Sequence, residues 1–352
     1  MFASKPVFIK TTKEFYKLNK DKCKPVFVDA LSRQIKELFM IENPRFSIDR
    51  NSAFSSPEFK NFVKKKQKDF NHIYFPWSNH IVKCVKEKDY FKLKTNRNRD
   101  LITKLEQKKL ADFTVGIVGL SVGGNTATAL IHNGFSKNIK LADFDKLDTT
   151  NLNRVRAKLS DIGVPKIDII KRQIFDTNPY VKISSFPDGL NRKNLKKFFV
   201  GNPKPKLVFE LIDDFEMKIL LRKEAKKDKI PVIMLTSLGD SVLIDVERYD
   251  IEPKVKLFNG KVGDKVLDKI LAGNISEQEK HQYAIDIVDV KNLPAEVKSS
   301  IKQIGKTLAG RPQLMSTVTV ASGFAVFLTR KIALREKVKS GRTLIKLDDF
   351  IK

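Results

Sequence analysis

The feature that most constrains this chain is a glycine-rich turn set between a short apolar run and a helix. The run Thr114–Val118 predicts a buried strand, and the turn GLSVGG follows it directly at residues 119–124. The helix predicted after the turn ends at Asn133–Gly134, a pair typical of helix C-termini. A second apolar run, Ile139–Ala142, predicts a second strand. This order of elements forms a βαβ unit whose turn is suited to binding a nucleotide phosphate.

Strands and helices continue to alternate after this unit. Further strands are predicted at Lys182–Phe186, Leu207–Ile212 and Pro231–Leu235, and helices at Val164–Thr177, Arg192–Phe199 and Glu216–Lys227. The alternation predicts an α/β fold with a Rossmann-like, doubly wound and mostly parallel sheet. Val242–Arg248 alternates apolar and charged residues, which predicts a half-exposed strand. Residues 313–338 predict a long apolar helix, and the last residues predict a closing edge strand.

The main domain is predicted to carry an accessory region and an insertion. Residues 1–95 are aromatic and mixed in character, and they form the N-terminal accessory region. Residues 96–352 form the main domain, which begins with a charged helix predicted over 96–112. Residues 251–310 contain scattered glycines and few periodic runs, and we expect them to form a loop-rich insertion.

The chain is strongly basic. It has 68 lysines and arginines against 41 aspartates and glutamates, a formal net charge of +27. Such a balance favours an acidic partner, for example a nucleotide, a nucleic acid such as tRNA, or a carboxylate-rich protein. Most of the excess is lysine spread along the whole sequence, however, and scattered lysine also describes a well-solvated surface.

The cysteine content and the apolar segments limit the kinds of metal site and the kinds of protein that the chain can be. The two cysteines, Cys23 and Cys84, form no CxxC pair, so a structural zinc site with four cysteines is excluded within this chain. Low cysteine content fits a reducing compartment. The N-terminus has no long apolar core, and no apolar run is long enough to span a bilayer. We therefore expect a soluble, cytoplasmic protein without a membrane partner.

The glycine turn and the carboxylates after the second strand form the predicted nucleotide site. Gly119 permits a tight bend, while Gly123 and Gly124 allow the backbone to approach a phosphate closely; Ser121 takes the middle position of the motif. By itself this motif does not separate NAD, FAD, S-adenosylmethionine and ATP. Asp143 ends the second strand, where a carboxylate binds ribose hydroxyls or, alternatively, stabilises a turn.

A polar cluster after the second strand favours a triphosphate. The segment TTNLNR, residues 149–154, places two amides and an arginine just beyond the ribose-binding position. Arg154 is suited to clamp a phosphate, and Asn151 to hold a phosphate oxygen or a metal-bound water. Lys166 stands at the start of the next predicted helix, where it adds positive charge toward a triphosphate.

A carboxylate at the end of a central strand completes the predicted site. Asp213 follows Leu207–Ile212, and ligands collect at the carboxyl ends of such strands. A carboxylate there suits Mg²⁺ that bridges to phosphates. Asp214 is either an alternative ligand or the N-cap of the following helix.

Taken in order, these motifs show a resemblance to a family. VGIVGLSVGG, LADFD, TTNLNR, GVPK and the strand that ends in Asp213 resemble the ThiF/MoeB/HesA superfamily of ubiquitin-activating-type adenylyltransferases. The resemblance covers roughly residues 96–248, with a weaker echo in the apolar helix at 313–335. RNRDLIT, NLNR, VERYD and RPQL make the chain more similar to bacterial stand-alone ThiF-family proteins.

The resemblance implies a role for each motif residue. It implies that the glycine turn cradles ATP, that Asp143 with Asp145 holds the ribose side, and that Asp213 binds Mg²⁺. It also implies catalytic roles for Arg99, Arg154, Lys166 and Asp213, with Asn151 at the phosphates. In this family an arginine near the N-terminus often reaches the active site of a partner subunit across a dimer, which implies a homodimer. Arg99 matches it, and Arg97 is a competing assignment.

The implied reaction is attack of a carboxylate on the α-phosphate of ATP, giving an acyl-adenylate and pyrophosphate. The acceptor would be a protein or peptide C-terminus, a small molecule or a group on tRNA. Because no cysteine follows Cys84, we expect no thioester relay. Ser121 and Asp214 depart from the usual family pattern. Alternatives are a non-catalytic partner or regulatory subunit and a tRNA-modifying dehydratase-like enzyme, while NLNR and Lys166 disfavour an NAD-dependent oxidoreductase.

Overall fold

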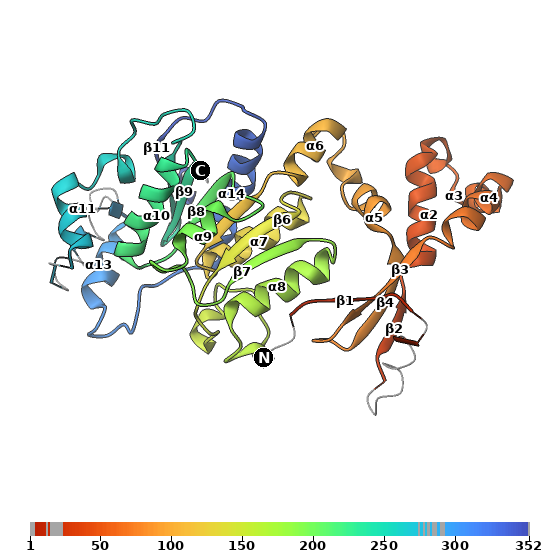
Figure 1. Cartoon of the computed structure of the whole chain (residues 1–352), viewed down its shortest axis with the longest axis horizontal. Helices are drawn as coiled ribbons and strands as arrows, with labels where there is room; N and C mark the ends of the chain where they lie inside the picture. Colours follow the sequence, from red (N-terminus) through yellow and green to blue (C-terminus); the bar gives the residue numbers. More distant parts are fainter. Residues whose placement is uncertain are drawn as a thin grey trace. The chain divides into compact units, whose positions relative to one another are not determined.

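The computed structural model of the chain contains two compact units. It describes residues 4–11, 13–14, 24–273, 275–276, 279, 282–283, 287–288 and 293–350, so Cys23 and parts of the predicted insertion lie outside the described residues. One unit comprises residues 1–108 and 171–181, and the other comprises residues 109–170 and 182–352. We call them the N-terminal unit and the main unit. Each has its own sheet (Figure 1).

The main unit is built on a seven-stranded sheet with the order β11-β10-β9-β8-β5-β6-β7. Its strands are β5 (Val115–Val118), β6 (Asn138–Ala142), β7 (Lys182–Phe186), β8 (Leu207–Glu210), β9 (Val232–Leu238), β10 (Ser241–Glu247) and β11 (Gly341–Lys346). The five strands from β9 to β7 are parallel, whereas β10 and β11 continue the sheet antiparallel. The predicted mostly parallel, Rossmann-like sheet is therefore confirmed.

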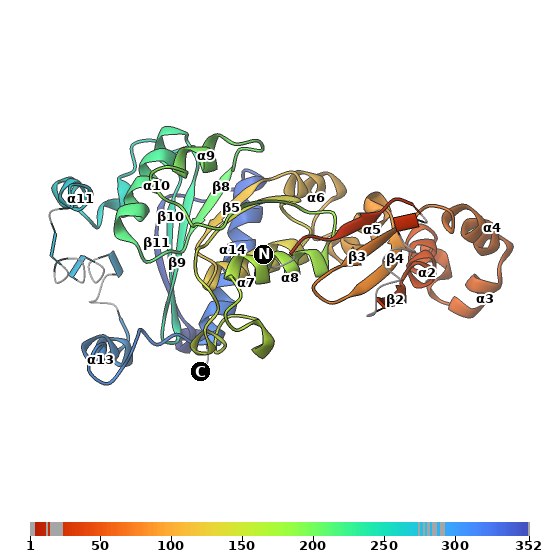
Figure 2. The same ribbon diagram turned by 60° about the horizontal axis from the view of Figure 1, so that its bottom comes forward.

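Helices cover both faces of this sheet. The helices along this part of the chain are α6 (Lys104–Ala111), α7 (Val122–His132), α8 (Lys166–Thr177), α9 (Leu195–Val200), α10 (Phe215–Lys227), α11 (Asp264–Leu271), α13 (Ala295–Gln303) and α14 (Met315–Ala333), of which α6 and α8 cross the boundary between the units. Figure 2 shows α9 and α10 on one side of the strands and α7 and α14 on the other. None of the described helices has the length and hydropathy that crossing a bilayer requires.

The connections explain why the site forms where it does. From β5 the chain proceeds through α7 to β6, and from β8 it proceeds through α10 to β9 in the opposite direction along the sheet. Right-handed crossovers then place α7 and α10 on opposite faces. The order reverses between β5 and β8, and ligands of doubly wound folds bind at the carboxyl ends of strands beside such a reversal.

Two predictions about secondary structure are wrong. Val242–Arg248 was expected to be half-exposed, but β10 is buried along its whole length, because its charged side chains are paired inside the protein. The helix expected over 96–112 is interrupted, since residues 96–98 form a short 3-10 turn and α6 begins only at Lys104. Thr103 and Glu106 form a reciprocal capping box that starts α6 at this point.

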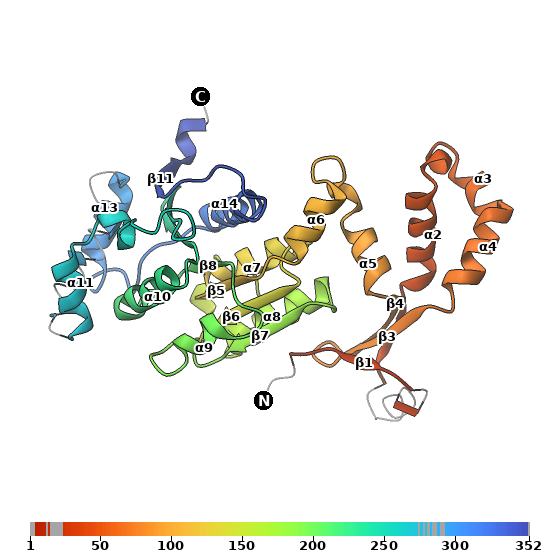
Figure 3. The ribbon, with the colours of Figure 1, turned by 45° about the horizontal axis from the view of Figure 1, so that its top comes forward.

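The N-terminal unit has a four-stranded sheet with the order β1-β3-β4-β2. It contains β1 (Val7–Ile9), β2 (Val26–Asp29), β3 (Phe70–Phe75) and β4 (His80–Val85), with helices α2 (Leu31–Glu42), α3 (Arg50–Ser55), α4 (Pro57–Lys66) and α5 (Glu87–Lys94). Figure 3 shows α2, α3 and α4 grouped on one side of this sheet. Their core is aromatic, with Phe39 packed against Phe46, Phe59 and Phe62.

Candidate active site

Three positions in the glycine-rich stretch at the junction of β5 and α7 have no room for a side chain. Gly119 has φ +90°, and a Cβ built there would lie 2.4 Å from the carbonyl oxygen of Leu211. A Cβ on Gly123 would lie 2.7 Å from the Ile117 side chain, and one on Gly124 would lie 2.5 Å from Ile170. Gly119 therefore allows the bend, and the other two glycines let α7 pack closely on its neighbours.

Asp143 stabilises the turn from the neighbouring strand. Its carboxylate accepts hydrogen bonds from the backbone N–H of Leu120 at 2.6 Å and of Asp145 at 2.8 Å. Burial raises the pKa of Asp143, and the two hydrogen bonds together with Lys166 act in the opposite direction. Asp143 thus has the turn-forming role that the sequence left open as an alternative. Its contact with a ribose stays a prediction.

Lys166 and Asp145 form an ion pair beside the turn. The Lys166 ammonium lies 2.8 Å from the Asp145 carboxylate, and the Lys166 backbone N–H donates to the Asp145 carbonyl oxygen, also at 2.8 Å. The Lys166 side chain is only 8% exposed, whereas that of Asp145 is 50% exposed. Lys166 is the first residue of α8, and Asp145 contacts both its backbone N–H and its side chain.

The polar segment after β6 is held rigidly by its own side chains. Residues Thr149–Asn151 form a 3-10 turn, in which Asp148 and Asn151 cap each other reciprocally. The Arg154 guanidinium donates to the carbonyl oxygen of Thr150 and to the side-chain oxygen of Asn153. Asn125 on α7 donates to the Arg154 carbonyl oxygen at 3.0 Å, so that Arg154 is tied to the helix that follows the glycine turn.

The two aspartates after β8 have different roles. Asp214 is the N-cap of α10, and its carboxylate accepts the backbone N–H of Met217 at 2.8 Å. Asp213 is exposed, and among the described residues its carboxylate has no hydrogen-bond or ion-pair partner. Asp213 is therefore the residue whose oxygens remain available, while Asp214 takes the capping alternative.

A cavity of about 980 Å³ brings most of the predicted residues together. Its wall includes Ser121, Asp145, Asn151, Arg154, Lys166 and Asp213. Gly119, Gly123, Gly124 and Asp143 are not part of this wall; they shape the turn behind it. Arg99 belongs to the N-terminal unit, just after the 3-10 turn Asn96–Asn98, and its predicted role remains untested.

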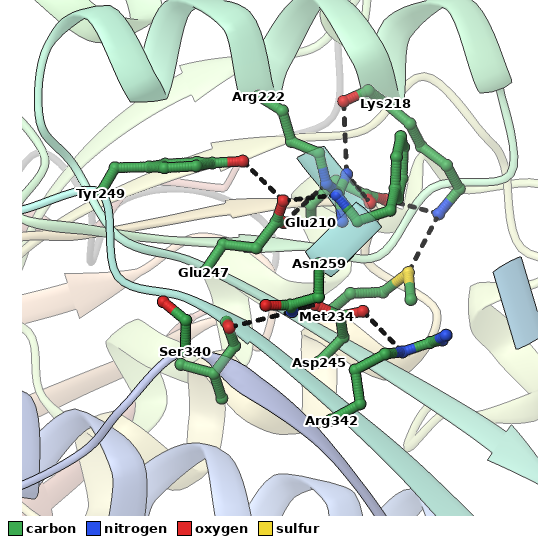
Figure 4. Close-up of polar contacts among 12 residues, drawn as sticks. Glu210, Lys218, Arg222, Met234, Asp245, Glu247, Tyr249, Asn259, Ser340 and Arg342 are labelled. Atoms are coloured by element: carbon green, nitrogen blue, oxygen red, sulfur yellow. Dashed lines mark hydrogen bonds and ion pairs between the residues drawn. The ribbon is translucent and has the colours of Figure 1, made fainter. Parts of the chain in front are cut away.

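A buried charge cluster on α10 was not predicted. Lys218 lies on the cavity wall and donates to Glu210 at 2.8 Å, and Arg222, one turn later, lies 2.6 Å from the other oxygen of Glu210 (Figure 4). Glu210 also accepts the backbone N–H of Ile212, just before Asp213. Burial raises the pKa of Glu210, but Lys218 and Arg222 outweigh burial and lower it overall. The sequence feature that could have indicated this cluster is Glu210, a glutamate at the end of an otherwise apolar strand.

The same cluster continues to β10 and β11. Arg222 is fully buried and donates to Glu247 at 2.7 Å, while Arg342 lies 2.8 Å from Asp245 (Figure 4). Glu247 also accepts the Tyr249 hydroxyl. These contacts explain why both acidic residues of β10 are buried, because each has a cationic partner inside the protein.

A loop before α14 contributes a further, unpredicted part of the wall. Gly310, Arg311 and Gln313 line the cavity. Asn153 donates to the Gln313 carbonyl oxygen at 2.8 Å, so this loop is attached to the segment that carries Arg154. The sequence marked RPQL as similar to relatives but assigned it no function.

The donors on this wall fit a phosphate and its cation. Within the described part of the chain, the buried Ser121 hydroxyl and the Arg154 Nε atom have no hydrogen-bond partner, and the Asp213 carboxylate on the same wall has none either. Mg²⁺ needs only one or two protein carboxylates when phosphates supply its other ligands. Among the residues that the structure describes, no group of three or more His, Cys, Asp or Glu side chains is placed to hold a metal without such help.

Comparison with known proteins gives a family match, two similar proteins and one similar solved structure. The profile of the ThiF family matches residues 94–253. An uncharacterised protein of Mycobacterium tuberculosis is 35% identical over 272 residues, 77% of this chain, which spans 37% of that protein. The tRNA threonylcarbamoyladenosine dehydratase of Bacillus subtilis is 32% identical over 213 residues, 60% of this chain and 80% of that protein. The crystal structure of Escherichia coli MccB with ATP has the same fold (TM-score 0.50, 18% identity, 85% of this chain and 76% of that chain).

Proposed function

This chain belongs to the ThiF family, and from that premise we propose that it is an ATP-dependent adenylyltransferase that activates a carboxylate. The observation that carries the proposal is the cavity wall, where Ser121, Arg154, Lys166 and Asp213 meet. Three of these residues offer donors to phosphate oxygens, and the fourth offers a carboxylate to a divalent cation. A dinucleotide would not use this set, because its diphosphate needs no such cluster beyond the glycine turn.

The reaction requires positioning and charge neutralisation from this chain. An acceptor carboxylate attacks the α-phosphorus of ATP, the bond to the bridging oxygen of the β-phosphate breaks, and pyrophosphate leaves from the acyl-adenylate. In this proposal Arg154 and Lys166 neutralise the phosphate oxygens in the transition state. Asp213 would hold Mg²⁺, which supplies further neutralisation of the phosphates when bound. The structural similarity to MccB, solved with ATP, supports the choice of nucleotide.

The proposal excludes a thioester step on Cys84. Cys84 is buried in the N-terminal unit, and its thiol lies 3.8 Å from the Tyr180 hydroxyl. Burial raises the pKa of this thiol, which disfavours the thiolate that a nucleophile requires. The acyl-adenylate would therefore pass directly to another nucleophile. We further propose a cytoplasmic homodimer, in which Arg99 of one subunit acts at the site of the other.

A second candidate is the modification of tRNA. The Bacillus subtilis relative is a tRNA threonylcarbamoyladenosine dehydratase, and the net charge of +27 suits a polyanionic substrate. If this candidate is right, tRNA binding should weaken steeply with salt, and tRNA should stimulate exchange of pyrophosphate into ATP. Exchange that depends on small acids or peptides and is unaffected by tRNA would reject it.

The direct test is pyrophosphate–ATP exchange with a panel of carboxylic acids and a cell extract as acceptors. We expect exchange by the wild type and its loss, by at least about a hundredfold, in Asp213→Ala. Asp188→Ala removes another exposed carboxylate from the same unit and should exchange like the wild type. No ATP binding by the wild type in titration calorimetry with Mg²⁺ would overturn the proposal.

A further inference from the structure

The cavity wall carries a second arginine, Arg311, in addition to Arg154 and the lysines Lys146, Lys166 and Lys218. Arg154 and Lys166 face the predicted phosphate position, whereas Arg311 comes from the loop before α14. Arg311 is half-buried, and among the described residues its guanidinium has no hydrogen-bond or ion-pair partner. A guanidinium without a partner in a concave wall is a binding group for an anion, and its planar fork matches a carboxylate especially well.

Asn153 holds this arginine close to Arg154. The side-chain amide of Asn153 accepts from the Arg154 guanidinium at 2.8 Å and donates to the Gln313 carbonyl oxygen at 2.8 Å. One amide thus bridges the two loops that carry the arginines. Burial lowers the pKa of Arg154, and the charge of Arg311 lowers it further, because like charges are kept near each other. An anion that binds between the two guanidinium groups would reduce the electrostatic repulsion between them.

Another part of the cavity wall is mostly apolar, although Thr236 and Ser237 of β9 also line it. Met234 and Leu238 of β9 line it, together with Val297 and Ile301 of α13 and Ile304 just after that helix. Lys218 lies on this part of the wall too, but Glu210 compensates its charge at 2.8 Å (Figure 4). A charged group bound against these apolar side chains would lose water without gaining an ionic partner, whereas an apolar group would be stabilised by burial.

We propose that Arg311 binds the carboxylate of the acceptor and that the apolar wall binds an apolar group attached to that carboxylate; this inference rests on the proposed function. The substrate class is then a carboxylic acid with an uncharged, apolar neighbour, either free or at the end of a peptide. An anionic acceptor must approach the anionic α-phosphate, and Arg311 supplies the cation that offsets this repulsion. Asn153 is a positioning residue that keeps the acceptor subsite beside the phosphates.

The test measures binding without turnover. The wild type is first saturated with Mg²⁺ and α,β-methylene-ATP, an ATP analogue in which the bond that must break is replaced by one that cannot be cleaved. It is then titrated with N-acetyl-leucine. We expect binding that weakens at least about tenfold in Arg311→Ala and less in Arg311→Lys. N-acetyl-leucinamide lacks the carboxylate and N-acetyl-aspartate lacks the apolar group, so both should bind at least about tenfold more weakly. Lys306→Ala removes an exposed charge nearby and should leave all affinities within about twofold.

The outcomes separate this inference from the proposed function. Absence of analogue binding by the wild type contradicts the proposed function. Analogue binding with no binding of N-acetyl-leucine, or equal binding by Arg311→Ala, overturns the acceptor subsite alone. Equal affinity for N-acetyl-aspartate overturns the apolar wall. A tripeptide ending in leucine distinguishes the source: tighter binding than N-acetyl-leucine assigns the acceptor to a peptide end, and equal binding assigns it to a small acid. Analogue binding also reports that each variant is folded.

Discussion

Replacing Gly119 by alanine should both destabilise the main unit and weaken nucleotide binding. Two costs act at this position. The backbone has φ +90°, where an L-residue costs about 1–2 kcal/mol relative to glycine. The added Cβ would also lie 2.4 Å from the Leu211 carbonyl oxygen and 2.7 Å from its carbon, and relieving such an overlap costs about 1–3 kcal/mol. We therefore expect a loss of about 2–5 kcal/mol in the free energy of unfolding.

Two other glycines separate these costs. Gly163 has φ +81° with no atom within 4 Å of a built Cβ, so Gly163→Ala should lose only the conformational part, about 1–2 kcal/mol. Gly323 lies on the exposed side of α14, also without a neighbour within 4 Å. Gly323→Ala should stabilise the protein by about 0.5–1 kcal/mol, because alanine is the better helix former.

The assay is urea unfolding followed by far-UV circular dichroism, together with calorimetric titration of ATP and Mg²⁺. The single tryptophan, Trp77, lies in the N-terminal unit, so its fluorescence serves as an internal control for the unit that is not mutated. Shifting Leu211 also displaces the segment that leads to Asp213, so the affinity of Gly119→Ala for the nucleotide should fall as well. A Gly119→Ala protein that matches Gly163→Ala in stability and the wild type in affinity would refute this reasoning.

Three further predictions concern charged side chains. Arg222→Met should lower the free energy of unfolding in urea by about 3–5 kcal/mol, because it leaves buried carboxylates without their cation. Lys223→Ala, at an exposed site, should change it by less than about 0.5 kcal/mol. Equal effects of the two substitutions would contradict the buried pairing. Burial, and then the charge of Glu247, raises the pKa of Asp245 from 3.8 to about 6, so the folded state holds its proton more tightly than the unfolded chain. As the pH rises from the lower to the higher of these two pKa values, the free energy of unfolding of the wild type should therefore fall by about 3 kcal/mol relative to that of Asp245→Asn. A constant difference between the two proteins over this pH interval would contradict the raised pKa of Asp245. Lys166→Met should lower pyrophosphate exchange about a hundredfold while the unfolding midpoint changes little; unchanged exchange would remove Lys166 from the site.

The local sequence signals were sufficient for the sheet and for six residues of the cavity wall: Ser121, Asp145, Asn151, Arg154, Lys166 and Asp213. The glycine turn, the polar segment around Arg154 and the lysine that begins α8 each depend on a few adjacent residues, so their positions follow from the order of the elements. The position of Asp213 follows in the same way, since Asp213 comes three residues after the end of β8, which pairs with β5 at the point where the strand order reverses. These residues meet at one cavity because the carboxyl ends of parallel strands share one edge of the sheet.

The charge cluster depends on distant pairing, which no local pattern contains. The acidic residues of β10 looked solvent-exposed because buried charges without partners are rare. Their partners are Arg222 on α10 and Arg342 on β11, and only the folded arrangement brings these three segments together. Arg311 was missed for a related reason, because its loop joins the site through Asn153 and a backbone carbonyl rather than through a sequence motif.

The measurement that tests the central claim most directly follows oxygen from the acceptor. The acid that best supports exchange is labelled with ¹⁸O in its carboxylate and incubated with ATP, Mg²⁺ and hydroxylamine as the final nucleophile, and the products are analysed by mass spectrometry. Attack of the carboxylate on the α-phosphorus predicts AMP that carries one ¹⁸O atom, unlabelled pyrophosphate and a hydroxamate. ADP with labelled orthophosphate, or AMP without the label, would contradict the account.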